Sequence, residues 1–433
     1  MANRQNAYGA PAQTIWLVSK YITPRKYGFE TRPFALARRF REEGRTPIVI
    51  TSDSNHFGTY PRFDSTYTRE IIDGVETWWV RTRKYTKTAS IARVISWIDF
   101  EIKLFRMPLE DLPKPDVILV SSLSLPTILN GLRMRRKYGG KLVFEIRDIW
   151  PLTAVEEGGF SPTNPFIKVL AWIERIGYRR SDMIVGTMPN LGEHVRNVAG
   201  RGLRCECVPF GFDPDFFSQN GEAPFDMEVR IPRGRLVVGY AGSMGTTNAL
   251  ETIIQCVKDL KDDDRFFFLF LGAGDLRDKF VAETIGLSNV AFLAKVDRSK
   301  VRAVLAQCDL LYFAVQDSPV WRYGMSLNKL IDYMMAGKPI VGSYSGYPSM
   351  LDEAGCGEFV PASDVNALKQ ALNRFAALSE ERRASMGRAG RDWLLANRPW
   401  EVVARKYLEL LDEVAGDSSP VARAMPPAAS AAG

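Results

Sequence analysis

Apolar residues lie along this chain in short runs that alternate with longer stretches of helical spacing. The first runs are Thr14–Ser19, Ile48–Ile50, Asp116–Val120, Lys141–Glu145 and Met183–Val185. They are too short for helices and have the nearly continuous apolar character of strands buried on both faces. Helical spacing is found in Phe34–Glu43, Pro126–Lys137 and Pro165–Tyr178. This alternation predicts an α/β fold with a doubly wound parallel sheet.

The same pattern begins again in the second half of the chain. Its strand-like runs are Leu236–Tyr240, Phe266–Leu271, Val290–Leu293, Leu310–Phe313, Ile340–Val341 and Gly357–Val360. Its helical stretches are Asn248–Leu260, Arg298–Gln307, Lys329–Met335, Val365–Ala376 and Glu380–Asn397. A length of 433 residues also exceeds one ordinary core, so two domains are expected.

Gly, Asp, Pro and Asn cluster near Phe210–Glu222, where we place the joint. We predict an N-terminal Rossmann-like domain over 14–212, completed by a helix at 399–415, and a second over 213–398. Residues 1–13 and 416–433 are expected to be disordered tails. Two such sheets facing each other leave a cleft between their carboxyl edges, where ligands should bind.

Composition narrows the chemistry. With only His56 and His194, a zinc site or a Ser-His hydrolase is improbable, and the five Cys show neither metal spacing nor a disulfide framework. Reduced thiols in a cytoplasmic protein are therefore expected, and no apolar run reaches 18 residues. The net charge of +7 is uneven, because residues 1–210 hold 32 Lys/Arg against 21 Asp/Glu. An anionic partner is expected for the first half.

The run Ser326–Val341 carries the most specific chemistry. It predicts a helix with Lys329 and Asp332 on one face, ended by Gly337 and Pro339. A cation and a carboxylate at the carboxyl end of a parallel sheet suit a nucleoside diphosphate, because one neutralises phosphate and the other accepts ribose hydroxyls. A surface ion pair between the two residues is an open alternative.

Two glycine-containing turns follow strands in the second half, and the first of them is a candidate for anion binding. Tyr240–Gly245 follows a strand and precedes a helix, so its glycines would let backbone N–H groups approach an anion. Gly272–Gly274 is interpreted as a plain turn. Lys295 follows the strand Val290–Leu293 and could reach a nucleobase, or it could be a solvated loop lysine.

The first half offers two sites at predicted strand ends. Gly28 lies in the loop after the first strand, where a glycine would let the backbone approach a sugar or phosphate. Arg147 and Asp148 follow the strand Lys141–Glu145, and charged residues at such a position are more often functional than structural. They could also simply pair with each other.

The segment Trp78–Met107 interleaves aromatic and basic residues. It combines Trp78, Trp79, Tyr85, Trp97, Phe100 and Phe105 with seven Lys/Arg, opposed only by Asp99 and Glu101. We interpret it as a segment that holds the protein on an anionic membrane. A partly buried helix with a solvated basic face is an equal alternative. A nucleic-acid surface ranks last, because no RNA- or DNA-binding module accompanies the segment.

Together these stretches resemble retaining family-4 glycosyltransferases of the GT-B fold, over about residues 14–415. The closest likeness is to a bacterial surface-polysaccharide subgroup that includes N-acetylfucosamine transferases. The resemblance rests on Tyr21, Pro24, Gly28, Glu30 and Arg32, and on the segments Arg147–Pro151, Val208–Asp213, Tyr240–Gly242 and Asn328–Pro339.

The resemblance implies a UDP-sugar donor on the second domain and a polyprenyl-diphosphate-linked saccharide acceptor on the first. The implied donor-binding residues are Gly28, Gly242, Ser243, Lys295, Asn328, Lys329 and Asp332, and the catalytic ones are Arg147 and Asp148. No metal or other cofactor is required, since helix ends and cations stabilise the departing diphosphate.

The chain departs from the family pattern at several positions. The family's glutamate pair survives only as Asp332, because the position eight residues earlier is Gly324. Arg147 stands where many members carry His. The basic residues usual after the Tyr-Ala-Gly turn are replaced by Ser-Met-Gly-Thr-Thr, so Lys329 and Lys295 would have to compensate.

We therefore predict a metal-independent, retaining transferase on the cytoplasmic face of the membrane. It would move an N-acetylated hexosamine or deoxyhexosamine to a lipid-linked saccharide in O-antigen, capsule or exopolysaccharide synthesis, without a nucleic-acid partner. The alternatives are a nucleotide-sugar 2-epimerase of the same fold and a non-catalytic partner subunit. The sequence does not identify the donor sugar, the acceptor, the linkage or the oligomeric state.

Overall fold

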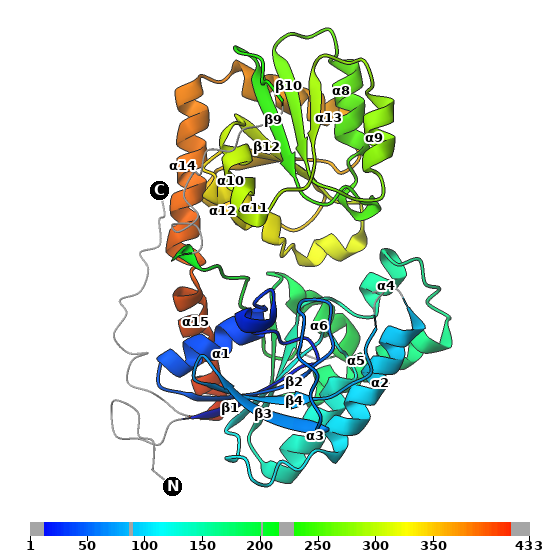
Figure 1. The fold of residues 1–433 in the computed structure, drawn as a ribbon, viewed down its shortest axis with the longest axis vertical. Helices are drawn as coiled ribbons and strands as arrows, with labels where there is room; N and C mark the ends of the chain where they lie inside the picture. Colours follow the sequence, from blue (N-terminus) through cyan, green and yellow to red (C-terminus); the bar gives the residue numbers. More distant parts are fainter. Residues whose placement is uncertain (1–12, 86–89, 201, 216–228, 417–433) are drawn as a thin grey trace. The chain divides into compact units, whose positions relative to one another are not determined.

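The computed structural model describes residues 13–85, 90–200, 202–215 and 229–416 (Figure 1). The predicted tails lie almost entirely outside these ranges. The chain divides into two compact units, one formed by residues 1–209 and 400–433 and the other by residues 210–399. Each unit is described by itself.

Unit 1 is built on one eight-stranded sheet in the order β3-β4-β2-β1-β5-β6-β7-β8. Its strands are β1 (Thr14–Val18), β2 (Thr46–Ser52), β3 (Tyr67–Ile72), β4 (Val75–Val80), β5 (Val117–Ser121), β6 (Lys141–Ile146), β7 (Met183–Gly186) and β8 (Cys205–Cys207). All neighbours pair in parallel except β3 and β4, which form an antiparallel hairpin. From β1, strands β2–β4 are added on one side of the sheet and the later strands, beginning with β5, on the other side, so β1 and β5 flank the topological switch point.

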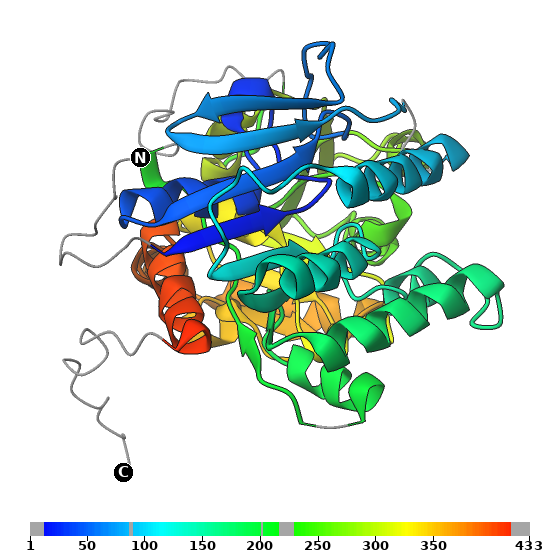
Figure 2. The same cartoon turned by 90° about the horizontal axis from the view of Figure 1, so that it is seen from below.

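Helices cover both faces of this sheet. They are α1 (Arg32–Glu42), α2 (Ile91–Arg106), α3 (Thr127–Tyr138), α4 (Leu152–Glu156), α5 (Pro165–Arg180), α6 (Leu191–Ala199) and α15 (Trp400–Ala415), with the short turn η1 (Arg25–Tyr27). The last helix, α15, packs against α1, and α3 packs against both α2 and α5 (Figure 2). The chain thus returns to unit 1 after completing unit 2.

A buried ion pair ties distant parts of unit 1 together. Arg32 Nε donates to Glu145 Oε1 at 3.0 Å, and both side chains are almost completely buried. The remaining Arg32 nitrogens donate to the carbonyls of Val208 (2.8 Å) and Pro209 (2.5 Å), and Tyr407 Oη donates to Glu145 Oε1 at 3.5 Å. These bonds satisfy a charge pair that would otherwise be costly to bury.

The structure corrects the interpretation of Trp78–Met107. Trp79, Trp97 and Phe100 are buried, because β4 and α2 turn them toward the core of unit 1. Trp78 and Tyr85 are half-buried, and of the six aromatic residues only Phe105 is largely exposed. The aromatic side chains on which the interpretation rested are therefore mostly core residues.

Unit 2 is built on a six-stranded sheet in the order β11-β10-β9-β12-β13-β14. Its strands are β9 (Leu236–Ala241), β10 (Phe266–Leu271), β11 (Val290–Leu293), β12 (Leu310–Ala314), β13 (Ile340–Ser343) and β14 (Gly357–Val360). Every neighbouring pair is parallel. The order reverses direction between β9 and β12, which makes that pair the topological switch point.

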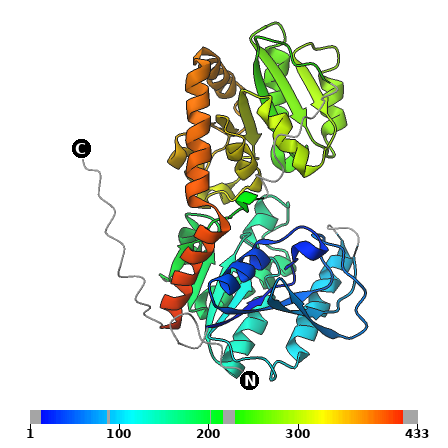
Figure 3. The ribbon, with the colours of Figure 1, turned by 60° about the vertical axis from the view of Figure 1, so that its left-hand side comes forward.

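The helices of unit 2 form two layers. They are α8 (Glu251–Asp259), α9 (Arg277–Glu283), α10 (Arg298–Ala306), α11 (Asn328–Met335), α12 (Met350–Ala354), α13 (Val365–Ala377) and α14 (Glu380–Asn397), with the turns η2 (Thr246–Asn248) and η3 (Pro319–Tyr323). Helix α13 packs on α8, whereas α14 packs along α11 and α12 (Figure 3).

The run Phe266–Leu271 shows why the strands of unit 2 are apolar throughout. Phe266, Phe268 and Phe270 pack into the core on the α8 and α13 side. The intervening Phe267 and Leu269 pack into the core on the α11 and α14 side. A strand covered on both faces has no solvent-facing positions, so polar alternation disappears. The prediction of two doubly wound parallel-sheet domains is confirmed.

Candidate functional site

The turn after β9 lies at the switch point of unit 2, where open parallel sheets bind their ligands. It runs through Gly242–Gly245 into η2. The predicted helix Asn248–Leu260 begins three residues late, at Glu251. The reason is Ala249, whose φ of 43° is left-handed and prevents η2 from continuing into α8.

Two buried tyrosines fix the path of this turn. Tyr333 Oη, from α11, accepts from the Ala241 N–H at 2.8 Å and donates to the Ala241 carbonyl at 3.1 Å. Tyr240 Oη donates to the Ser243 carbonyl at 2.5 Å. Helix α11 and the turn are therefore locked together by side-chain bonds to the backbone.

The turn after β10 supports the first turn from the side. Gly242 N donates to the Leu271 carbonyl (3.0 Å), and Met244 N donates to the Ala273 carbonyl (2.9 Å). A Cβ at Gly272 would lie 1.9 Å from the Gly242 carbonyl oxygen, so any larger residue would push the turns apart. The glycines of Gly272–Gly274 thus serve backbone packing, as expected of a plain turn.

Several N–H groups of the first turn are available to a ligand. Within the described part of the chain, the N–H groups of Ser243, Gly245 and Thr246 have no hydrogen-bond partner. Ser243 and Thr246 are exposed to solvent. Adjacent backbone N–H groups in a turn form a concave site that binds an anion.

The ammonium group of Lys329 lies beside this turn. Its Nζ donates to Asn248 Oδ1 and lies 5.2 Å from the ring centroid of Tyr240. Burial lowers the pKa of Lys329 to about 8. Among the described residues no carboxylate forms an ion pair with this ammonium group, so an incoming phosphate would be strongly favoured.

Lys329 and Asp332 do not form the alternative surface ion pair. Among the described residues, no ion pair joins them, and Asp332 is half-buried one turn along α11. Asn328 begins the helix and is exposed. The structure therefore brings Gly242, Ser243 and Lys329 together, with Asp332 on the same helix.

Lys295 and Gly324 occupy different positions from these residues. Lys295 is exposed and follows β11, the edge strand two places from β9. Gly324 ends η3 with a φ of 103°, a left-handed conformation that strains any carboxylate residue. A glutamate at position 324 would therefore be strained in this backbone conformation.

In unit 1, Arg147 and Asp148 follow β6 as predicted. Ser122 Oγ, at the end of β5, accepts from the Arg147 N–H at 3.1 Å and donates to the Asp148 carbonyl at 3.5 Å. The described residues include no ion pair between the two side chains. Asp148 is solvent-accessible, yet the protein packed around it raises the pKa of its carboxyl, against the opposing charges of Arg147 and Arg93.

The glycine at position 28 has a local structural reason. A Cβ there would lie 2.4 Å from the Phe57 carbonyl oxygen, because Gly28 pairs with Gly58 in an isolated β-bridge. Its approach to a donor stays a prediction.

The histidine at position 194 is paired inside unit 1. His194 Nε2 lies 2.6 Å from Glu174 Oε1, and both side chains are buried.

Residues that the sequence did not point to complete the site. Asn248 holds the ammonium group of Lys329, and Tyr333 holds Ala241. Gln316, which follows β12, donates from Nε2 to the Thr246 carbonyl at 3.0 Å and so links both strands of the switch point. The sequence shows that Asn248 is a polar residue beside the glycine turn. Its contact with Lys329 joins positions 81 residues apart, so no local sequence pattern predicts it.

The described residues contain neither a cluster suited to a metal ion nor a helix suited to cross a membrane. No group of three or more His, Cys, Asp or Glu side chains is placed to hold a metal ion. None of the described helices has the length and apolarity needed to cross a membrane.

Known proteins share this architecture. Sucrose-phosphate synthase from Thermosynechococcus elongatus is 16% identical, with a TM-score of 0.68 over 94% of this chain and 100% of its own. The E. coli structure described as trehalose-6-phosphate bound with UDP-2-fluoro glucose is 12% identical, with a TM-score of 0.69 over 93% and 99%. Anabaena HepE in complex with UDP is 13% identical, with a TM-score of 0.61 over 93% and 100%.

These similarities extend over both units. None of the curated proteins matches the sequence. Residues 235–377, which hold the turn after β9 together with Lys329 and Asp332, match the family described as Glycosyl transferases group 1. The chain has the GT-B fold, and its second unit carries the region similar to that family.

Proposed function

We propose that this protein is a glycosyltransferase that takes its sugar from a UDP-sugar. The observation that carries the proposal is the combination of open N–H groups at Ser243, Gly245 and Thr246 with the ammonium group of Lys329. Both kinds of donor suit the two phosphates of a nucleoside diphosphate. The family match over residues 235–377 and the UDP and UDP-2-fluoro glucose of the similar structures support the proposal.

In the proposed donor complex, Gly242 permits close approach of the diphosphate and Ser243 and Lys329 contact its oxygens. Asp332 accepts the ribose hydroxyls, and Asn328, Lys295 and Gly28 contribute further donor contacts. Burial makes the interaction with Lys329 strong, because a low local dielectric strengthens the attraction between an anion and a cation that pairs with no carboxylate in the described part of the chain. No metal ion is needed when N–H groups and an ammonium group neutralise the leaving diphosphate.

The proposed reaction exchanges one bond at the anomeric carbon of the donor sugar. The bond from that carbon to the diphosphate oxygen breaks, and a bond to the acceptor hydroxyl oxygen forms. The hydroxyl proton passes to the departing diphosphate, which leaves as UDP, and the anomeric configuration is retained. Asp148 orients the acceptor hydroxyl, and Arg147 lies beside it to offset negative charge.

The proposed acceptor is a saccharide on a polyprenyl diphosphate at the cytoplasmic face of the membrane, in bacterial surface-polysaccharide synthesis. The excess of Lys/Arg over Asp/Glu in residues 1–210 supports an anionic acceptor on unit 1. An N-acetylated hexosamine or deoxyhexosamine remains our proposal for the sugar.

No observation favours the epimerase alternative. Such a reaction needs acid and base groups at the sugar, and His194 is instead buried against Glu174. The second alternative, a non-catalytic partner subunit, would bind a nucleotide or a membrane but form no product.

The proposal is tested with purified protein and a panel of UDP, ADP, GDP and their sugars. A transferase should bind UDP and its sugars most tightly and release UDP only when a lipid-linked saccharide is added. Conversion of the free UDP-sugar without acceptor would indicate an epimerase. Binding without product under any acceptor would indicate a non-catalytic subunit, and preference for ADP or GDP would contradict the donor assignment.

A further inference from the structure

Helix α2 is apolar on two opposite faces. Its buried face, with Trp97, Phe100 and Leu104, packs into unit 1. Its other face is exposed and consists of Ile91 (79%), Ile95 (39%), Ile98 (55%), Ile102 (45%) and Phe105 (57%). A helix that is hydrophobic all round is normally buried or in contact with lipid, so this exposed face requires an explanation.

The five exposed residues form one continuous stripe. Their spacings of four, three, four and three residues keep them within about 80° of the helix circumference, at 100° per residue. The stripe runs along the whole helix, from the first residue of α2 to the last but one. Contiguous exposed apolar patches of this kind mark contact surfaces.

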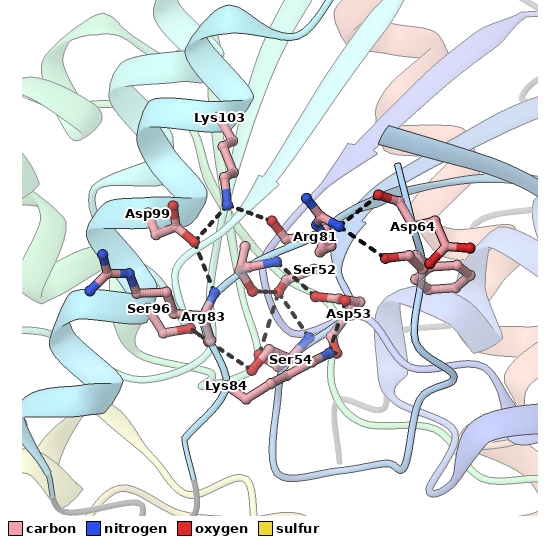
Figure 4. Close-up of polar contacts among 12 residues, drawn as sticks. Ser52, Asp53, Ser54, Asp64, Arg81, Arg83, Lys84, Ser96, Asp99 and Lys103 are labelled. Carbon is pink, nitrogen blue, oxygen red and sulfur yellow. Dashed lines mark hydrogen bonds and ion pairs between the residues drawn. The ribbon is translucent and has the colours of Figure 1, made fainter. Parts of the chain in front are cut away.

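Three polar residues of α2 are bonded to the rest of unit 1. Figure 4 shows Ser96, Asp99 and Lys103 bonded to the segment after β4. Ser96 Oγ donates to the Arg83 carbonyl (2.6 Å), and Asp99 Oδ2 accepts from the Arg83 N–H (2.8 Å) and from Lys103 Nζ (2.9 Å). These bonds and the buried apolar face hold α2 firmly on unit 1. The stripe of five apolar residues is therefore exposed on a helix that is packed in place.

The two neighbouring helices extend the exposed apolar surface. Helix α3 adds Leu129, and Arg133 on the same helix lies over the ring of Phe105, with its Cζ 4.3 Å from the ring centroid. Helix α5 exposes Phe166 (39%), Val169 (53%) and Trp172 (58%). We call the exposed apolar residues of α2, α3 and α5 the three-helix face.

The three helices are strongly basic. They hold eleven Lys/Arg and three Asp/Glu. Seven of the basic residues are exposed: Arg106, Arg136, Lys137, Lys168, Arg175, Arg179 and Arg180. The three carboxylates are all engaged inside unit 1. Asp99 binds Lys103, Glu101 accepts from Ser124, Thr127 and Asn130 on the α3 side, and Glu174 pairs with His194. An anionic partner would therefore meet cations without facing a solvent-exposed acidic side chain of these helices.

We infer that the three-helix face docks on an anionic lipid bilayer. Its isoleucines can enter the acyl boundary while the flanking Lys/Arg side chains contact acidic headgroups. A second copy of this chain is disfavoured, because an isologous contact would bring two basic faces together. The inference deepens the proposed function and rests on it for its purpose, since an acceptor on a lipid carrier lies at such a surface.

The inference differs from the sequence-based interpretation of Trp78–Met107 in its residues. The buried Trp79, Trp97 and Phe100 do not take part. The isoleucines of α2 and the exposed residues of α5 replace them. The prediction of a membrane-bound surface in unit 1 is therefore kept, with a different set of side chains.

The test measures co-sedimentation of the full chain with vesicles of phosphatidylglycerol and phosphatidylcholine, and with phosphatidylcholine alone. The double variant Ile98→Asn/Ile102→Asn should bind the anionic vesicles at least about tenfold more weakly than the wild type. Ile71→Asn is the matched control, because Ile71 is 59% exposed on β3 of the same unit. It should bind like the wild type, and neutral vesicles should bind weakly.

Equal vesicle binding by the double variant and the wild type would overturn the inference, as would equal binding to neutral and anionic vesicles. Sedimentation velocity without lipid provides a second readout. A wild-type dimer that the double variant converts to monomer would assign the face to a protein contact and overturn the inference too. UDP titration without vesicles reports on the donor site alone, so failure of docking and failure of the proposed function are distinguishable.

Discussion

The carboxyl edges of the two sheets share a topology but differ in the use of their polar groups. In unit 1, the buried ammonium group of Lys20 donates to the Ser54 carbonyl (2.5 Å) and to Ser52 Oγ (3.3 Å), and Arg32 is paired with Glu145. In unit 2, the N–H groups of Ser243, Gly245 and Thr246 in the turn after β9 have no partner among the described residues. Within the same described residues, Lys329 contacts a neutral amide and an aromatic ring and forms no ion pair.

The difference teaches that a charged residue at a strand's carboxyl end is not by itself a ligand site. In unit 1 the buried charges are satisfied by the protein and hold separate segments together. In unit 2 the donors are fixed in place by Tyr240 and Tyr333 but left available. Removing the Glu145 carboxylate should therefore cost stability in unit 1, whereas removing the Lys329 ammonium group should cost ligand affinity in unit 2.

The largest expected effect is on the stability of unit 1. Glu145→Leu leaves the buried guanidinium of Arg32 without its carboxylate, which should lower the free energy of unfolding by about 3–5 kcal/mol. Urea denaturation measures the change. Glu110→Leu is the control, because Glu110 is exposed and pairs with the exposed Lys137, so its loss should cost less than about 1 kcal/mol. Equal effects of the two changes would remove the distinction drawn for unit 1.

The corresponding change in unit 2 should affect binding instead. Lys329→Ala should weaken UDP binding about 100-fold, since it removes a desolvated charge from the diphosphate, with little change in thermal stability. Isothermal titration calorimetry measures the affinity. Lys279→Ala, at an exposed lysine of the same unit, should bind UDP as the wild type does. An unchanged affinity for Lys329→Ala would exclude this lysine from the donor site.

A pH series sharpens the comparison further. Burial lowers the pKa of Lys20 to about 7, while the unfolded chain keeps the ordinary value near 10.4. Between about pH 7 and pH 10 the unfolded state binds more protons, so this residue makes stability rise with pH by up to about 1.4 kcal/mol per pH unit. Lys20→Met should lose that part of the slope, as measured by urea denaturation at each pH. Parallel curves for the two proteins would show that Lys20 titrates normally.

The smallest effect separates the two glycine turns of unit 2. A Cβ at Gly245 would have only Ser243 Oγ, at 3.7 Å, as its nearest neighbour, whereas one at Gly272 would collide with Gly242. Gly245→Ala should leave the melting temperature nearly unchanged but weaken UDP binding by about fivefold, because the methyl group crowds an anion at the N–H groups. Gly272→Ala should lower the melting temperature. Loss of stability in Gly245→Ala with normal binding would reverse this assignment.

The fold was largely predictable, because a strand that is buried on both faces is a continuous run of apolar residues in the sequence, as Phe266–Leu271 is. The hairpin of β3 and β4 was missed, because Tyr67–Ile72 and Val75–Val80 are only partly buried and mix charged with aromatic residues. The same mixture led to the interpretation of Trp78–Met107 as a surface segment. Periodicity indicates an apolar face, but it does not say which of two apolar faces of α2 is covered.

The candidate site was predictable as far as it is local in sequence. Lys329, Asp332 and the turn Tyr240–Gly245 could be named from spacing and glycine content. The contacts of Asn248 with Lys329 and of Tyr333 with Ala241 join positions 81 and 92 residues apart, so no local pattern announces them. Sequence also could not reveal that Arg147 and Asp148 share Ser122 as a backbone partner.

Hydrogen–deuterium exchange with and without UDP tests the central claim most directly. The account predicts that saturating UDP slows amide exchange in the turn Gly242–Asn248, where Ser243, Gly245 and Thr246 have open N–H groups, and at the start of α11 around Lys329. UDP that binds tightly, while both of these segments exchange as fast as in the free protein, would contradict the account.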